Sequence, residues 1–466
     1  MFETMYSRSS FIRTHLLSTS KLAQVWQPLL SPRFHGSTAA RHDSDLKARI
    51  RSVRTMANRP TIREVVAVAE FRALWIAHAQ SRLGDQLARV AIAVLVFDRT
   101  ESALLTAVTY ALSFLPPLVS APLLTGLADR FPRRTVMVVT ELGRAALTAA
   151  MAIPGLPIVA VVLLLVAVVS LQPLYSAARN ALLPDVLEGD RYVVGVGLAS
   201  ATDSVVQVLG FAAGGVLVSL TGSHLALGIN AATFVVSATL VRTGVRHRDA
   251  SAATRRSVGR SVSAGVRLIW SDHRLRSLLS LLYLYGFYLA PEGLAAPYAA
   301  QAGAGDAAVG LLMAADPVGA MIGSVLLSRW LPVRWRSRSM GPLAVASAVP
   351  LAMSALYPSV PGAVVLWVLV GVLSSYTMLV HATFVRLVPD DRRGQVIGLA
   401  SAGLQAAQGL GVAAAGVLAE VTTAATSVGL MGAAGGLLAV LAGRSWIRAE
   451  RPARAAGTDR SRSTHS

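Results

Sequence analysis

The segment TGLADRFPRR, at residues 125–134, is a short charged turn between two long apolar stretches. One apolar stretch ends at about residue 127 and the next begins at about residue 135, so the two must run antiparallel and meet on one side of a bilayer. Arginines are retained on the cytoplasmic side when membrane helices insert. The turn therefore predicts two membrane helices that are joined at the cytoplasmic face.

The composition indicates a helical membrane protein. The 466 residues are 54% hydrophobic and only 14% charged. Apolar stretches of about 20 residues recur and are continuous rather than alternating, which favours helices over a barrel. The net charge of +19 lies in connections and tails, where it sets topology, so we expect no nucleic-acid partner. The absence of cysteine excludes disulfides and thiolate metal sites, and we expect no metal and no cofactor. The preference for arginine over lysine indicates a GC-rich, bacterial genome.

Twelve membrane helices are expected in an all-α fold. The connections that would face outward contain one basic residue, Arg99, whereas arginine recurs in the others. This asymmetry predicts a multi-pass protein of the cell membrane with both termini in the cytoplasm. The expected helices are at about 73–97, 102–127, 135–153, 157–178, 192–220, 223–242, 276–300, 307–329, 339–357, 361–384, 394–420 and 424–446.

An internal repeat divides the chain into two halves of six helices. GLASATDSVVQVLGFAAGGVL at 197–217 aligns without gaps with GLASAGLQAAQGLGVAAAGVL at 398–418. In this alignment Gln207 matches Gln408, Gly210 matches Gly411, and Gly215 matches Gly416. LLPD at 182–185 likewise corresponds to LVPD at 387–390, and LSRWLPVRWR at 327–336 is a degenerate copy of the charged turn. Two related six-helix halves are typical of a transporter whose site lies at their interface.

The segments outside the two halves have their own expectations. We interpret positions 1–55 as a disordered or mis-annotated extension that precedes a start at Met56, with a mitochondrial transit peptide as the alternative. The expected organisation is an extension and lead-in at 1–70, an N-terminal six-helix bundle at 71–243, a basic cytoplasmic linker at 244–275, a C-terminal six-helix bundle at 276–446, and a disordered cytoplasmic tail at 447–466.

The charged turn also carries a family resemblance. Its sequence fits the pattern G-x-L-A-D-R-x-G-R-R of the major facilitator superfamily at Leu127, Ala128, Asp129, Arg130, Arg133 and Arg134, whereas Thr125 and Pro132 replace the two glycines and Gly126 lies one place late. The chain resembles this superfamily over about residues 70–446. The resemblance implies two pseudo-symmetric bundles and a gating turn (Gly126, Asp129, Arg130, Arg133 and Arg134) that latches the halves in the outward-open state. Alternatively, these arginines only set topology.

GFAAGG at 210–215 is similar to the superfamily's antiporter pattern G-P-x-x-G-G, with Phe211 in place of proline. Small residues such as Gly210, Gly214 and Gly215 let membrane helices approach closely. The motif therefore has two interpretations, a mark of an exporter or plain helix packing. The glycine-rich second copy favours packing.

Charged residues inside the apolar helices are candidates for the site, because buried charges in membrane proteins face a cavity or one another. Asp85 and Arg89 are four residues apart and share a helix face with Arg82. Asp85 is the main candidate for proton coupling or substrate contact, and a structural ion pair with Arg89 is the alternative.

Asp203 and Asp316 are further candidates for proton coupling, because neither has a partner nearby in the sequence. Glu141 and Arg144 are three residues apart and are interpreted as a structural pair. Glu292 is expected near the outer end of its helix, where it would line an entrance.

A nucleotide-binding loop is absent from the sequence, so transport would draw on a gradient. We predict a monomeric secondary active transporter, specifically a proton-coupled exporter that works by alternating access. The resemblance extends to the drug, macrolide and siderophore exporters, which implies a small amphipathic substrate, antiport and multidrug resistance. The alternatives are an importer of a small metabolite and a transport-dead membrane sensor. An enzyme is not expected, because no convergent cluster of a nucleophile and a base is visible.

Overall fold

The computed structural model describes residues 60–128, 130–248, 258–356, 358–390 and 392–463. The expected extension at 1–55 and the turn residue Asp129 lie outside the described residues. Within the described ranges the chain is helical and contains no strand. Residues 61–466 form one compact unit.

The first half of this unit ends in a long helix that is broken at a glycine. α10 is 55 residues long, about twice what one crossing of a bilayer needs. Gly222 divides it, because its φ of 79° and ψ of 163° are open to a residue without a side chain. The elements of this half are α4 (Ile62–Val66), α5 (Ala69–Thr100), α6 (Ala103–Ala111), α7 (Pro116–Ala128), α8 (Arg133–Met151), α9 (Ile158–Val186) and α10 (Asp190–Gly244).

The second half contains a membrane helix made of several short pieces. Residues 273–301 are divided into α12 to α15, with a bend of 47° after Gly293. The elements of this half, together with α11 in the linker, are α11 (Val258–Ser271), α12 (His273–Tyr283), α13 (Tyr285–Tyr288), α14 (Ala290–Gly293), α15 (Ala295–Gln301), α16 (Asp306–Trp330), α17 (Val333–Met353), α18 (Val360–Ser374), α19 (Tyr376–Leu387), α20 (Arg393–Val421) and α21 (Ala424–Ser463).

The prediction of twelve membrane helices in an all-α fold is confirmed. Within the described ranges, seven helical stretches are long and apolar enough to cross a membrane, and the bent helix at 273–301 is an eighth. The 55-residue α10 supplies two crossings rather than one. The polar helices α5, α8 and α17 complete the twelve.

The last helix extends beyond the twelfth expected membrane span. Residues 447–466 were expected to be disordered, but α21 continues without a break to Ser463. Arginine, alanine and glutamate directly after Trp446 favour continuation of the helix, whereas Pro452 and Gly457 further on do not. The linker at 244–275 likewise contains a helix, α11.

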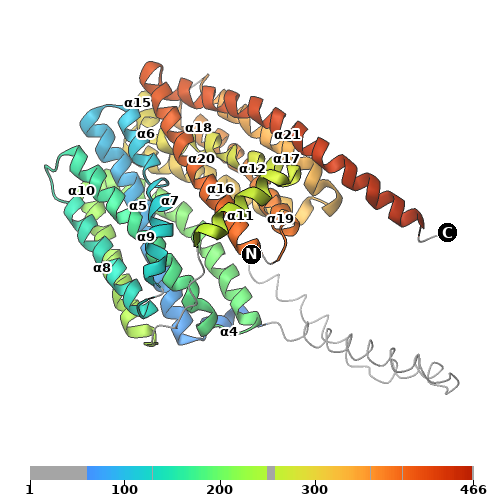
Figure 1. Cartoon of the computed structure of the whole chain (residues 1–466). Helices are drawn as coiled ribbons and strands as arrows, with labels where there is room; N and C mark the ends of the chain where they lie inside the picture. The colour runs from blue at the N-terminus through green and yellow to red at the C-terminus, as the bar shows by residue number, and fades with distance from the viewer. Residues whose placement is uncertain (1–59, 129, 249–257, 357, 391, 464–466) are drawn as a thin grey trace, which may run out of the picture. The chain divides into compact units, whose positions relative to one another are not determined.

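The two halves meet along two pairs of helices. Within the first half α5 packs along α10, and within the second half α16 packs on α18 and α17 packs on α21. Figure 1 shows the first half in blue to green and the second in yellow to red, with α11 between them. Across the interface α10 packs on α16, and α6 packs on α20.

The repeated glycines make equivalent contacts in the two halves. A methyl group on Gly210 would lie 2.6 Å from Gln86 of α5, and one on Gly411 would lie 2.1 Å from a backbone oxygen of α13, so both face the first membrane helix of their own half. A methyl group on Gly215 would lie 2.7 Å from Gly310 of α16, and one on Gly416 would lie 2.6 Å from a side chain of α6. Both of these contacts cross to the other half. The sequence repeat is therefore also a repeat of packing.

The two ends of the bundle differ in the connections that they carry. The basic end is the one at which α7 ends and α8 begins, and the opposite end is the one at which α5 ends and α6 begins. At the opposite end, Glu420 of α20 accepts hydrogen bonds from the Ser102 hydroxyl (3.2 Å) and the Leu104 backbone N–H (3.3 Å). These bonds join the second half to the N-terminus of α6, where a carboxylate is favoured by the helix dipole.

Candidate functional site

A cavity of about 1310 Å³ lies between the two halves. Its inner wall includes Arg82 and Arg89 from α5, Gln172 from α9, and Gln405 and Gln408 from α20. It extends to the basic end, where it is lined by Pro122, Asp390 and Gly394. Most of the polar lining groups are amides, hydroxyls and guanidinium groups, which are hydrogen-bond donors.

Direct contacts between the halves lie on the side of the opposite end. The Tyr110 hydroxyl of α6 donates a hydrogen bond to the carboxylate of Glu292 in α14. Both side chains are buried, with 4% of Tyr110 and 3% of Glu292 exposed. The Glu420 bonds and the contacts of Gly215 and Gly416 lie nearer the opposite end. The cavity is therefore open toward the basic end and bounded by contacts between the halves toward the other.

The charged residues of α5 belong to a network with α8. A carboxylate oxygen of Asp85 lies 2.7 Å from the Arg144 guanidinium, and the other lies 3.6 Å from Arg82. Arg144 also lies 3.1 Å from Glu141, which has no exposed surface and accepts a further bond of 3.1 Å from the Ser81 hydroxyl. The predicted pair of Glu141 and Arg144 is confirmed. Asp85 therefore pairs with Arg144 of α8 and with Arg82, and not with Arg89.

Arg89 is not part of this network. Its guanidinium carbon lies 5.5 Å from the centre of the Phe114 ring and 6.0 Å from that of Tyr110. Among the described residues no carboxylate oxygen lies within 4.0 Å of it. Arg89 is thus a partly exposed cation on the cavity wall that is held by aromatic faces.

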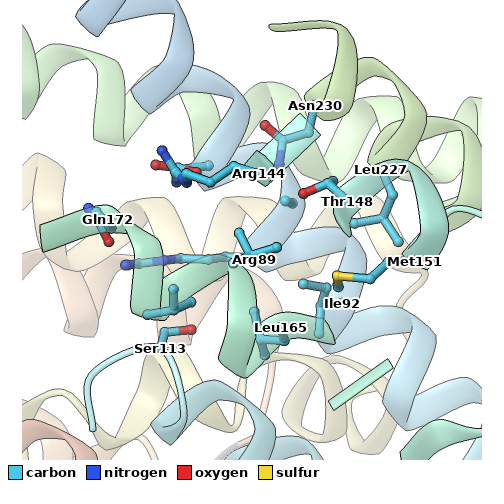
Figure 2. A pocket seen from close by; sticks show the side chains of 14 residues that line it. Arg89, Ile92, Ser113, Arg144, Thr148, Met151, Leu165, Gln172, Leu227 and Asn230 are labelled. Carbon is cyan, nitrogen blue, oxygen red and sulfur yellow. The ribbon is translucent and has the colours of Figure 1, made fainter. Parts of the chain in front are cut away.

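A side pocket of about 40 Å³ lies inside the first half, behind Arg89. Arg89, Ser113 and Gln172 line both this pocket and the large cavity. In Figure 2 the Arg89 side chain extends along the pocket toward Gln172 and Ser113. The remaining wall is largely apolar and includes Ile92, Met151, Leu165, Val168 and Leu227.

The other two candidate carboxylates have partners from distant parts of the sequence. Asp203 lies 2.8 Å from the Nε2 atom of His78 on α5, and its side chain is 39% exposed. Asp316 accepts a hydrogen bond of 2.6 Å from the Tyr285 hydroxyl and is 4% exposed. The structure brings neither of them into the lining of the large cavity.

Glu292 is a residue of the interface between the halves that the sequence did not indicate. We expected it to line an entrance, but it is buried between the halves instead. The reason is the break in its helix, where Pro291 and Gly293 flank it. A proline and a glycine within an apolar segment are a signal of a discontinuous membrane helix, and such helices often mark transporter sites.

The arginines of the charged turn bond within the first half. Arg133 donates to the Ala181 carbonyl (2.7 Å) and pairs with Asp185 of the LLPD segment. Arg134 donates to the Val245 carbonyl (3.2 Å) at the end of α10. Arg130 is exposed, and a methyl group on Gly126 would meet no atom within 4 Å.

The glycines of the GFAAGG segment, on α10, make packing contacts. Gly210 and Gly214 are four residues apart and both face α5, where a methyl group on Gly214 would lie 3.1 Å from Val90. Gly215 faces α16 of the other half. These are close backbone approaches of the kind that small residues allow between membrane helices.

Known proteins share this architecture. A curated relative, the uncharacterized MFS-type transporter YfiS of Bacillus subtilis (strain 168), is 30% identical over 162 residues, which are 34% of this chain and 39% of that protein's length. Three solved structures have similar folds, each at 82% coverage of this chain. One is a bacterial homologue of the human lysosomal transporter Spinster in an inward-facing and occupied conformation, with a TM-score of 0.66, 14% identity and 96% of that chain covered. The second is the peptide transporter POT in complex with sulfate, with a TM-score of 0.66, 14% identity and 95% of that chain covered. The third is the nucleoside transporter NupG, with a TM-score of 0.65, 15% identity and 99% of that chain covered.

The family model described as Major Facilitator Superfamily matches residues 74–363 and 293–464, which together cover most of the chain. This match includes the turn, the repeat and the cavity between the halves. The chain belongs to the Major Facilitator Superfamily and is a multi-pass membrane transporter.

Proposed function

We propose that this protein is a proton-coupled exporter of a small amphipathic molecule that works by alternating access. The cavity between the halves carries the proposal, because it is open toward one end and bounded by contacts between the halves toward the other. The arginine-rich connections favour a cytoplasmic position for the basic end and both termini, in a bacterial cell membrane. In that orientation the cavity opens to the cytoplasm, as expected of an inward-facing state. The fold likeness to an inward-facing Spinster homologue supports this assignment.

Asp85 is the proposed proton-coupling residue. Its carboxylate joins α5 to α8 through Arg144, contacts Arg82, and lines the side pocket. Protonation would remove the charge-assisted character of the bond to Arg144 and loosen the link between the two helices. Asp203 and Asp316 are the further candidates, because each carboxylate is bonded to a titratable or hydroxyl group of another helix.

The charged turn is the proposed latch at the basic end in the outward-open state. It consists of Asp129, Arg130, Arg133 and Arg134. Arg133 and Arg134 bond to carbonyls and to Asp185 of their own half while the cavity is open at this end. This arrangement is what a disengaged latch requires, since an engaged one would contact the second half.

The test is proton flux in inside-out membrane vesicles with an imposed pH gradient and a pH-sensitive dye. Adding a transported compound should dissipate the gradient in wild type and not in Asp85→Asn. Asp190→Asn is the matched control, because Asp190 is exposed at the start of α10. Unchanged flux in Asp85→Asn, or flux independent of the gradient, would contradict coupling through this residue.

The direction of transport is tested with the same compounds. Accumulation inside inside-out vesicles indicates export. Accumulation inside right-side-out vesicles instead indicates an importer, and binding without flux in either preparation indicates a sensor.

A further inference from the structure

The charge on the cavity wall indicates what the cavity binds. The charged residues in its lining are Arg82, Arg89 and Asp390. Asp390 lies at the basic end and is paired with Arg393, three residues later in the chain. The inner part of the lining therefore contains two arginines and no acidic residue.

The two arginines differ in how their charge is balanced. Arg82 and Arg144 share the carboxylates of Asp85 and Glu141, so this group of four has no net formal charge. Arg89 is outside the group. The carboxylate of Glu292 accepts the hydrogen bond of the Tyr110 hydroxyl, and the Tyr110 ring lies 6.0 Å from the Arg89 guanidinium carbon. Arg89 is thus the cation of the inner wall that has no ionic partner within 4.0 Å among the described residues.

The groups around Arg89 indicate which other features a ligand bound there would have. Ser113 and Gln172, beside it, offer hydrogen bonds at the junction of the cavity and the side pocket. The side pocket beyond has a largely apolar wall, to which the paired side chains of Asp85 and Arg144 also contribute, and a volume of about 40 Å³, room for a few non-hydrogen atoms. Gln405 and Gln408 face the cavity from the second half.

We infer that the substrate is a small amphipathic organic anion. Its carboxylate or phosphate binds the Arg89 guanidinium, and a short apolar substituent beside the acidic group enters the side pocket. The planar guanidinium presents parallel N–H donors that match either anion. A cationic substrate would meet Arg89 and find no unpaired carboxylate in the inner lining. This inference rests on the proposed transport function, and it names the substrate class of that site.

The experiment measures binding to the purified full-length protein in lipid nanodiscs by thermal stabilisation and by calorimetric titration. The probes are matched sets that share a hydrocarbon group: butyrate with butyramide and butylamine, benzoate with benzamide and benzylamine, and the butyl and phenyl phosphates. We expect anions to bind and the amides and amines not to bind. Comparing the carboxylates with the phosphates identifies the acidic group.

Three variants make the test specific. Arg89→Gln should weaken anion binding at least tenfold, and Arg89→Lys should restore part of it. Arg99→Gln is the control on the same helix, because Arg99 bonds to the Leu156 carbonyl at the opposite end, and it should bind as wild type. Ile92→Phe, which fills the side pocket, should weaken the binding of butyrate more than that of acetate, a further probe whose methyl group is too short to enter the pocket.

The outcomes separate this inference from the proposed function. Binding of the amines, equal binding of anions and amides, or full anion binding by a folded Arg89→Gln protein would overturn the inference, as would the absence of binding by every anion. Gradient-driven transport of a cation would overturn it while leaving the exporter proposal intact. Anion binding without proton flux would leave the inference intact and overturn the exporter proposal.

Discussion

Tyr110 and Glu292 are 182 residues apart in sequence and share a hydrogen bond inside the interface between the two halves. The tyrosine hydroxyl donates, and one carboxylate oxygen accepts. The other oxygen of Glu292 is buried without a hydrogen-bond partner in the described part of the chain. An unsatisfied buried carboxylate oxygen is unfavourable, so the tyrosine hydroxyl is important for keeping Glu292 in the interface.

Removing the Tyr110 hydroxyl should shift the protein toward conformations in which the opposite end is open. Tyr110→Phe leaves Glu292 without its donor in the closed state, at a cost of about 1–3 kcal/mol, which corresponds to about a 5- to 150-fold shift in equilibrium. The chain contains no cysteine, so Ala107→Cys introduces a single reporter at the contact with Gly416. Labelling from the outer side by a membrane-impermeant maleimide should be faster in the Tyr110→Phe background.

Tyr288→Phe is the matched control for this labelling. Tyr288 donates a buried bond of 2.6 Å to the Ala344 carbonyl inside the second half, so its loss should lower thermal stability without changing the labelling rate. An equal labelling rate in Tyr110→Phe and wild type would show that the tyrosine does not hold the halves together.

Gly215→Ala should separate α10 from α16. The added methyl group would lie 2.7 Å from Gly310 and 2.8 Å from the Ala307 carbonyl, and both neighbours are backbone atoms that cannot rotate away. We expect the closed opposite end to lose about 1–3 kcal/mol, with faster labelling of the Ala107→Cys reporter. Gly228→Ala is the control, since its methyl group would meet no atom within 4 Å. Wild-type labelling of Gly215→Ala would mean that the two helices are less tightly packed than these distances indicate.

Arg144 should be essential for stability. Its side chain is 4% exposed, bonds to Asp85 and Glu141, and lies 4.2 Å over the Phe234 ring. Arg144→Leu leaves the buried Glu141 without an ionic partner and Asp85 with only the 3.6 Å contact to Arg82, so it should destabilise the fold by about 3–5 kcal/mol. The measurement is the denaturation temperature in detergent by fluorescence-detected chromatography.

A second substitution tests the cause of that loss. Adding Glu141→Gln to Arg144→Leu should recover part of the stability, because it removes the buried charge that has lost its ionic partner. Arg242→Leu, on an exposed position of α10, should change little. No recovery in the double variant would show that the loss comes from packing rather than charge.

Glu70 should make stability depend on pH near the start of α5. It precedes the membrane-spanning part and holds the Arg248 guanidinium with both carboxylate oxygens, one of them at 2.9 Å. Burial acts to raise the pKa of Glu70, but the bonds from the Arg248 side chain and the Arg246 backbone N–H outweigh it and lower the pKa. The ion pair therefore stabilises the fold above the ordinary pKa of glutamate and loses this effect as pH falls through the lowered pKa.

The measurement compares wild type with Glu70→Gln. At pH 7 wild type should be more stable by about 1 kcal/mol, and the difference should disappear as pH falls through the lowered pKa of Glu70. Glu64→Gln, which alters an exposed residue bonded to Thr61, should track wild type across the same pH range. A difference that persists in acid would contradict an ionic origin.

The sequence was sufficient to predict the helices and their division into halves. Continuous apolar stretches near Leu165 or Val368 have few alternatives to a membrane helix, and the match of Gly210 with Gly411 reveals the repeat directly. The pair of Glu141 and Arg144 was also predictable, because residues three apart lie on one helix face.

Contacts between helices were not predictable in this way. The partners of Asp85 and Asp203 are Arg144 and His78, which are distant in the sequence, so helical spacing gives no information about them. A pair of Asp85 with Arg89 was the alternative that the spacing offered, because the four-residue rule describes one helix in isolation. The sequence around Tyr110 does not indicate its contact with Glu292, because that residue belongs to the other half.

The closure made by Gly215 and Gly416 is backbone packed against neighbouring helices without any charge. Salt and pH have no group to act on in the glycine contacts themselves, whereas the carboxylate of Glu420 lies beside them and bonds to Ser102 and Leu104. Any effect of pH on this closure would therefore act through neighbouring carboxylates such as Glu420 and Glu292, and not through the glycine contacts. Substitutions at the glycines would therefore change the packing of this closure, and substitutions at the carboxylates would change its charge.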